Sequence, residues 1–90
     1  MMPGPEKLMY DIMRMHVKLP GFYVDVTDSI CIVLNKRRIA IFVSDGKYNV
    51  TVDQIDENGD FAKNMSWSTF KDVAVAVTEL KNQVKTANSL

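Results

Sequence analysis

Residues 30–52 read ICIVLNKRRIAIFVSDGKYNVTV, and turn signals divide this stretch into three strands. Asp45-Gly46 is a dipeptide that type I′ hairpin turns favour, because both central positions need a positive φ. A turn there predicts the cross-strand pairs Val43–Tyr48, Phe42–Asn49, Ile41–Val50, Ala40–Thr51, Ile39–Val52 and Arg38–Asp53. A second turn at Lys36-Arg37 predicts the pairs Leu34–Ile39, Ile32–Ile41 and Ile30–Val43. Both turns put the large aliphatic residues on one face, and a slip of one residue in either would destroy this agreement.

The alternation continues on both sides of this stretch. Phe22, Val24 and Val26 alternate with polar or smaller residues, and a loop at 27–29 would place them opposite Leu34, Ile32 and Ile30. Asn58-Gly59 is a further turn signal that folds Phe61 to Trp67 back as a fifth strand. That strand is expected to put Met65 beside Val52 and Trp67 beside Val50, with Trp67 in the core beneath a helix.

Helical patterns precede and follow the strands. The first runs from near Pro5 to His16 or Val17 and stops before Pro20-Gly21. The second begins around Ser68 or Thr69, where residues 69–72 fit a capping box. Its apolar stripe comprises Phe70, Val73, Ala74, Val77, Leu80 and Val84. The expected fold is α+β: an N-terminal helix, an antiparallel meander of four to five strands and a C-terminal helix, with both helices packed on one sheet face.

Length and composition are those of one globular domain over residues 1–90, with loose termini at 1–4 and 86–90. The chain is 47% hydrophobic and 24% charged, and no apolar run approaches a membrane span or a signal peptide. A single cysteine rules out an intrachain disulfide. This cysteine usage favours a reducing compartment, so we expect the protein to be cytoplasmic.

The residues that could carry out catalysis do not form a recognisable motif. Cys31 and His16 are the one candidate nucleophile and base, but Cys31 lies in the middle of a predicted strand. The acidic segment 53–60 resembles a calcium loop, yet Gln54 and Met65 would occupy the first and last ligand positions. We therefore expect no enzyme activity, no metal and no cofactor.

A basic turn makes nucleic-acid binding an alternative. Its candidate residues are Lys36, Arg37, Arg38, Lys47 and Lys63, with Tyr48, Phe42 and Trp67 as stacking surfaces. The order of strands and helix over about Ile30 to Leu80 resembles the transcriptional coactivators that bind single-stranded DNA. The likeness lies in the basic first hairpin, residues 36–39, and in the helix entry through residues 65–68. Residues 61–64 lack that family's run of glycine and lysine, and the first helix has no counterpart. Double-stranded RNA-binding domains are matched more loosely.

Electrostatics disfavours this alternative. Eleven basic residues balance eleven acidic ones, whereas nucleic-acid-binding proteins usually carry a basic excess. In a meander, alternate turns share one end of the sheet, so the basic turn at 36–38 lies at the same end as the acidic turn at 56–60. Two strand spacings separate these turns, about 10 Å, which is roughly one Debye length.

The other face of the predicted sheet is apolar at its centre and polar at its rim. The apolar residues are Tyr23, Cys31, Val33, Ala40 and Phe42, and the rim consists of Asp25, Arg38, Asn49 and Thr51. Either a helix crosses to cover this face, or the face binds a partner. Because ninety residues rarely support two cores, we expect a small protein-binding module, and a homodimer is its simplest form.

Overall fold

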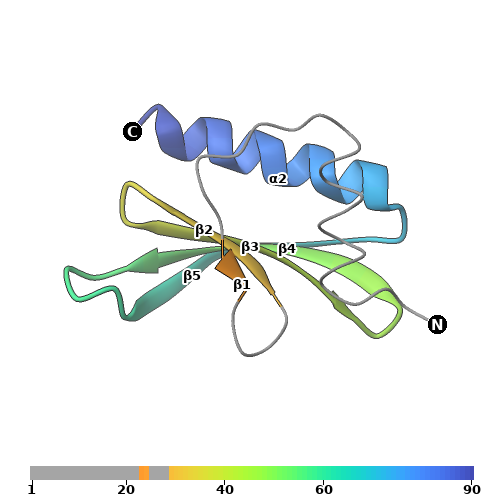
Figure 1. Cartoon of the computed structure of the whole chain (residues 1–90), viewed down its shortest axis with the longest axis horizontal. Helices are drawn as coiled ribbons and strands as arrows, with labels where there is room; N and C mark the ends of the chain where they lie inside the picture. The colour runs from red at the N-terminus through yellow and green to blue at the C-terminus, as the bar shows by residue number, and fades with distance from the viewer. Residues whose placement is uncertain (1–22, 25–28) are drawn as a thin grey trace.

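The computed structural model describes residues 23–24 and 29–90, which form one antiparallel sheet and one helix (Figure 1). The strands pair in sequence order, as the sequence predicts. Their bounds are β1 Tyr23–Val24, β2 Ile30–Leu34, β3 Arg37–Ser44, β4 Lys47–Ile55 and β5 Phe61–Phe70, followed by α2 Val73–Asn88. The α+β class is confirmed, while the N-terminal helix expected from about Pro5 to Val17 lies outside the described residues. No helix in the described part of the chain is long and apolar enough to cross a membrane.

The β3–β4 hairpin has the predicted register. Asp45 and Gly46 both have positive φ, 53° and 72°, as a type I′ turn requires. All the cross-strand pairs expected from this turn are present, from Val43–Tyr48 to Arg38–Asp53. Nothing crowds a Cβ placed on Gly46, so only its backbone conformation favours glycine there.

The β2–β3 turn differs from the prediction by one position. It is formed by Asn35 and Lys36, with φ of 51° and 61°, and Arg37 begins β3. Ile32 therefore pairs with Ile39 and Ile30 with Ile41, so the predicted register was wrong by two residues. A shift of two residues keeps every side chain on its predicted face. Asparagine tolerates the left-handed conformation better than arginine, which accounts for the placement of the turn.

The outer strands show larger departures. Val24 pairs with Ile30 instead of Ile32, so the β1–β2 register also differs from the prediction by two residues. In β5, Trp67 pairs with Thr51 and Ser66 with Val52, so Trp67 lies on the face opposite to the helix. The expected position of Trp67 in the core beneath α2 was therefore wrong. The register expected from the Asn58-Gly59 turn is present at Gln54–Lys63 and Asp53–Asn64. The one-residue shift between Asp53 and Val52 then moves Trp67 from Val50 to Thr51, and so to the other face.

The helix starts later than the capping box predicts. β5 continues to Phe70, and Asp72 is the N-cap of α2. The Oδ1 atom of Asp72 accepts hydrogen bonds from the backbone N–H groups of Ala74 and Val75, at 2.8 and 3.3 Å. Thr69 is still in the strand, and its hydroxyl is bound elsewhere on the sheet. An aspartate at this position satisfies the otherwise unpaired N–H groups of the first helical turn.

The main core lies between α2 and one sheet face, which we call the helix face (Figure 1). Its buried residues are Ile30, Ile32, Ile39, Ile41, Val50 and Val52 from the sheet and Ala76, Val77, Leu80, Val84 and Ala87 from the helix. The predicted stripe is confirmed at Val77, Leu80 and Val84, whereas Ala74 is exposed. One polar contact fastens the end of the helix: the side-chain Nδ2 of Asn35 donates to the carbonyl of Ala87 at 2.7 Å.

Candidate protein-contact surface

The sheet face opposite to α2, which we call the second face, collects the side chains of alternate strand residues. One row runs across all the strands through Tyr23, Cys31, Ala40, Thr51 and Trp67. A neighbouring row runs through Val33, Arg38, Asp53 and Asn64, and a shorter one through Phe42, Asn49 and Thr69. The five residues predicted for protein binding, Tyr23, Cys31, Val33, Ala40 and Phe42, are therefore brought together on one face.

These five residues differ in their exposure to solvent, and so in how far a partner could contact them. Cys31 and Ala40 are buried and form the floor of the face. Val33 is 49% exposed, Tyr23 is also exposed and Phe42 is half-buried. A partner would therefore contact Tyr23, Val33 and Phe42, while Cys31 and Ala40 supply close packing beneath them.

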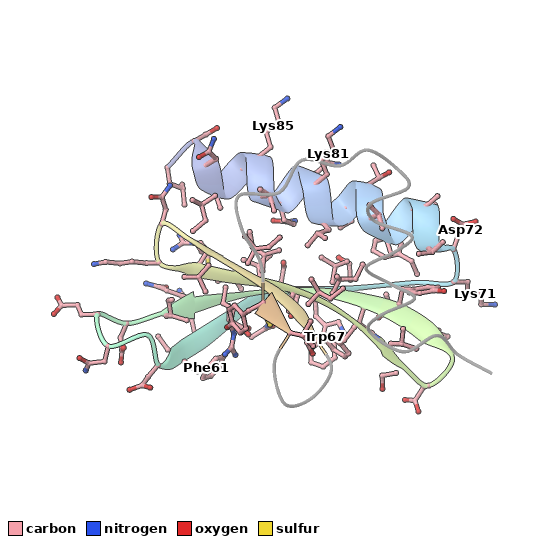
Figure 2. The ribbon with its side chains drawn as sticks, viewed as in Figure 1. Phe61, Trp67, Lys71, Asp72, Lys81 and Lys85 are labelled. Atoms are coloured by element: carbon pink, nitrogen blue, oxygen red, sulfur yellow. The ribbon has the colours of Figure 1, made fainter. Side chains whose placement is uncertain are left out.

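Trp67 is the most exposed aromatic residue of the second face. The main interpretation of the sequence placed it in the core, and only the nucleic-acid alternative used it as a stacking surface. It is 62% exposed and points away from α2, as does Phe61 (Figure 2). Its ring meets the ring of Phe42 edge to face, with centroids 5.8 Å apart. Its indole Nε1 donates to Oδ1 of Asn49 at 3.0 Å. An exposed indole with two fixed contacts is held in place before any partner arrives.

Asn49 is the polar centre of this arrangement. It is only 5% exposed, and its Oδ1 also accepts a hydrogen bond from the Thr69 hydroxyl at 2.9 Å. Its Nδ2 donates to the carbonyl of Lys47 at 3.3 Å. Because a buried amide must satisfy both its oxygen and its nitrogen, these bonds fix the orientation of Asn49 and, through it, that of Trp67.

A hollow of about 790 Å³ lies on the second face. Phe42, Phe61 and Trp67 are its aromatic walls, and Arg38, Asp53 and Asn64 supply polar groups. The floor includes Cys31, Ala40 and Thr51. Small residues beneath large ones make the face concave, so a side chain of a partner could be inserted between the aromatic rings.

The charges on this face largely neutralise each other. Nη2 of Arg38 lies 3.4 Å from Oδ2 of Asp53, as the cross-strand register predicts. Partial burial lowers the pKa of Arg38, but the hydrogen bond and the charge of Asp53 outweigh it, so the pKa lies above its ordinary value. Arg38 therefore remains a cation, and Asp53 compensates its charge.

Tyr23 and Cys31 are adjacent across β1 and β2. Partial desolvation, followed by the nearby Cys31, raises the pKa of Tyr23, which outweighs the lowering effect of Arg38. Cys31 is 1% exposed, and its thiol donates to the carbonyl of Ser29 at 3.8 Å. The phenol of Tyr23 therefore stays neutral at the surface, and the thiol of Cys31 lies buried beside it. His16, the base considered for Cys31, lies outside the described residues.

The residues considered for nucleic-acid binding are brought together only in part. Lys36 lies in the β2–β3 turn, and Lys47 follows the β3–β4 turn at the other end of the sheet. Arg37 lines a small cavity beside the C-terminal end of α2, while Arg38 is paired on the opposite face. Lys63 stands opposite Gln54, which also pairs with Arg37, so Arg37 and Lys63 lie on one face near Lys36. The structure therefore brings Lys36, Arg37 and Lys63 to one end of the sheet, but leaves Arg38 on the opposite face and Lys47 at the other end.

The acidic turn uses one of its carboxylates to hold its own backbone. Oδ1 of Asp56 accepts hydrogen bonds from the N–H groups of Asn58 and Asp60, at 2.8 and 2.9 Å. The turn lies at the same end of the sheet as the basic turn, because Ile55 N–H donates to the carbonyl of Lys36 at 3.0 Å. Within residues 23–24 and 29–90, no group of three His, Cys, Asp or Glu side chains could hold a metal ion.

No family model, curated protein or solved structure matches this sequence.

One signal could have placed Trp67 correctly. Phe70 packs against the core under α2, and a regular strand puts residues three apart on opposite faces. Counting back from Phe70 puts Ser68 and Ser66 on the helix face and Trp67 on the second face. Counting forward from the Asn58-Gly59 turn fails, because the irregular pairing before Ser66 cannot be recognised in the sequence.

Proposed function

We propose that this chain is a small non-enzymatic protein-binding module, a regulator, inhibitor or adaptor, that acts through its second face as a homodimer. The observation that carries the proposal is Trp67, which is 62% exposed and yet fixed by Asn49 and Phe42. Within its own chain, the indole leaves more than half of its surface in contact with water. It can gain a large buried apolar area only from another molecule.

The composition of the face supports this proposal. Residues that dominate binding energy at interfaces are enriched in Trp, Tyr and Arg, and Trp67, Tyr23 and Arg38 lie here together. Trp67 is also oriented in advance, so binding would cost less side-chain entropy than it would for a mobile tryptophan. The hollow beside it offers a place for a side chain of the partner.

A second copy of the chain is the occupant that these charges permit. Two identical surfaces that carry a net charge would repel each other across a two-fold axis, but Arg38 and Asp53 compensate one another. The chain as a whole has equal numbers of basic and acidic residues, so no long-range repulsion opposes self-association. Within this proposal we place the protein in the cytoplasm, because its single cysteine fits a reducing compartment.

The test measures the mass of the protein in solution and the emission of Trp67, which is the only tryptophan of the chain. We expect the wild type to show mass above that of a monomer as concentration rises, and the emission to shift to the blue as Trp67 becomes buried. Phe42→Asp should stay folded by circular dichroism, lose the blue shift of the Trp67 emission, and reach a lower mass than the wild type at the same concentration. Val75→Asp is the matched control, because Val75 is an exposed aliphatic residue on α2.

Two outcomes would refute the proposal. If Phe42→Asp unfolds the chain while Val75→Asp does not, Phe42 belongs to the core and the face is not a contact surface. If the wild-type emission is the same at every concentration, Trp67 is not buried by a second copy.

Exposed aromatic residues also support a second candidate, binding of single-stranded nucleic acid. Trp67, Phe61 and Tyr23 lie on one face and could stack on bases. The test is an anisotropy titration against a labelled single-stranded oligonucleotide at about 50 mM and about 200 mM salt, where phosphate contacts weaken steeply. Binding that disappears at the higher salt, and in a variant with Lys36, Arg37 and Arg38 changed to alanine, would favour this candidate over the homodimer.

A further inference from the structure

The strand β5 is a long edge of the sheet. It has ten residues, and within the described part of the chain it pairs only with β4. The opposite edge, β1, has two residues in that part. α2 packs mainly on β3 and β4, so the helix does not cover the outer side of β5. An edge strand presents backbone N–H and C=O groups that can pair with another strand.

The half of β5 that leads into the helix lacks the features by which proteins usually protect an edge. From Ser66 to Phe70 there is no charged residue, no proline and no glycine. The register shifts end before Ser66, and residues 66–70 pair regularly with β4. Proteins that avoid edge pairing place lysine, proline or bulges on such strands. Here Lys63 and the bulges lie only in the other half of β5.

We propose that β5 pairs with β5 of a second copy, antiparallel and around a two-fold axis at Ser68, to form a continuous sheet across the two copies. Two copies of one strand that pair antiparallel around a two-fold axis match each other by symmetry. A foreign peptide would need a sequence that happens to match β5. The pairing would satisfy backbone groups on both copies at once. It goes beyond the proposed function, because it uses the edge of the sheet and not the second face.

The side chains select the position of the axis. An axis at Ser68 sets Trp67 opposite Thr69 of the second copy, an aromatic residue beside a β-branched one, which is a favourable pair. With this axis, residues of the same parity pair with each other, so the side chains of each pair lie on the same face of the continuous sheet. An axis at Trp67 would also place paired side chains on the same face, but it would bring Lys63 opposite Lys71 of the second copy. Like charges directly opposite each other destabilise a strand pair.

The two contact surfaces together would build assemblies larger than a dimer. One two-fold contact through the second face and another through β5 leave each copy with two partners. Such a protein forms a closed tetramer or an open chain, depending on the angle between the two axes.

The experiment removes the face contact first, by using Phe42→Asp as the background, and follows mass by sedimentation over a wide range of concentrations. We expect Phe42→Asp to form a dimer at high concentration through β5. Adding Ser68→Lys or Ser68→Asp should abolish this dimer, because two like charges would meet at the axis. Mixing the Lys and Asp variants should restore it, since opposite charges then meet. Ser68→Thr, which is neutral and favours strands, should leave the dimer intact.

The outcomes separate the two proposals. A strictly monomeric Phe42→Asp overturns the β5 pairing, whatever the wild type does. A wild type that forms nothing beyond the dimer of Phe42→Asp overturns the face contact but keeps the edge contact. If either Ser68 variant loses its circular dichroism spectrum, the folded Phe42→Asp protein decides: a dimer that Ser68→Thr preserves supports the edge contact, and a strict monomer overturns it.

Discussion

The two faces of the sheet are made by alternate residues of the same strands, and they are filled in opposite ways. On the helix face, the central positions of β2, β3 and β4 are large aliphatic residues that α2 buries. On the second face, the central positions are small, Cys31, Ala40 and Thr51, and the large residues stand exposed at the flanks. Large residues at the centre of a face form a core, whereas small residues with large ones around them form a hollow.

Matched deletions on the two faces should give the largest difference in stability. Leu80 is fully buried against the helix face, and Leu80→Ala should lower the free energy of unfolding by about 2–5 kcal/mol. Val33 is half exposed, and Val33→Ala should change it by less than about 0.5 kcal/mol in the monomer. Urea denaturation at low protein concentration measures both values. Similar losses would mean that the second face is also part of the folding core.

The polar contact between Asn35 and Ala87 tests how firmly the helix is held on its face. Asn35→Gly keeps the positive φ and loses the hydrogen bond, which should cost about 1 kcal/mol. Asn35→Ala also strains the turn, so we expect an additional cost of about 1 kcal/mol. Thermal unfolding of the two variants separates the contributions. Equal stability of Asn35→Gly and Asn35→Ala would show that the φ of this residue is unimportant.

The hydrogen bonds of Asn49 test how firmly Trp67 is held on the second face. Asn49→Ala removes the acceptor of Trp67 and Thr69, and because Trp67 can bind water instead, we expect a loss of about 1 kcal/mol. The fluorescence anisotropy of Trp67 should fall as the indole becomes mobile, and its affinity for a second copy should fall with it. Thr69→Val, which removes only one donor, should leave the anisotropy near that of the wild type.

The smallest expected effect is a change in the stability of the fold at alkaline pH. The pKa of Tyr23 is raised above its ordinary value of 10.0, so the folded state favours the neutral phenol. The resulting stabilisation is present below pH 10.0 and is lost as the pH rises through the raised pKa of the folded state. We expect Tyr23→Phe to show a weaker decline of stability above this pH. The same slope in both proteins would contradict the assignment.

The centre of the fold could be predicted from the sequence, and its periphery could not. The Asp45-Gly46 turn fixed one hairpin, because its two residues adopt conformations that few others tolerate. At Asn35-Lys36 the aliphatic pattern was satisfied by registers two residues apart, so parity was correct and pairing was not. The five residues of the predicted contact set share one face because their assignment rested on parity alone. Trp67 was misplaced, since irregular pairing leaves no mark in the sequence.

The order of the strands has a consequence for how the chain folds. Every strand pair joins neighbours in sequence, so the sheet can grow one hairpin at a time with short loop closures. The helix is different: its last turn is bonded to a residue 52 positions earlier. The end of α2 can acquire that partner only after the β2–β3 hairpin exists. We therefore expect amide protection to appear first in the central hairpins and last at the C-terminal turn of the helix.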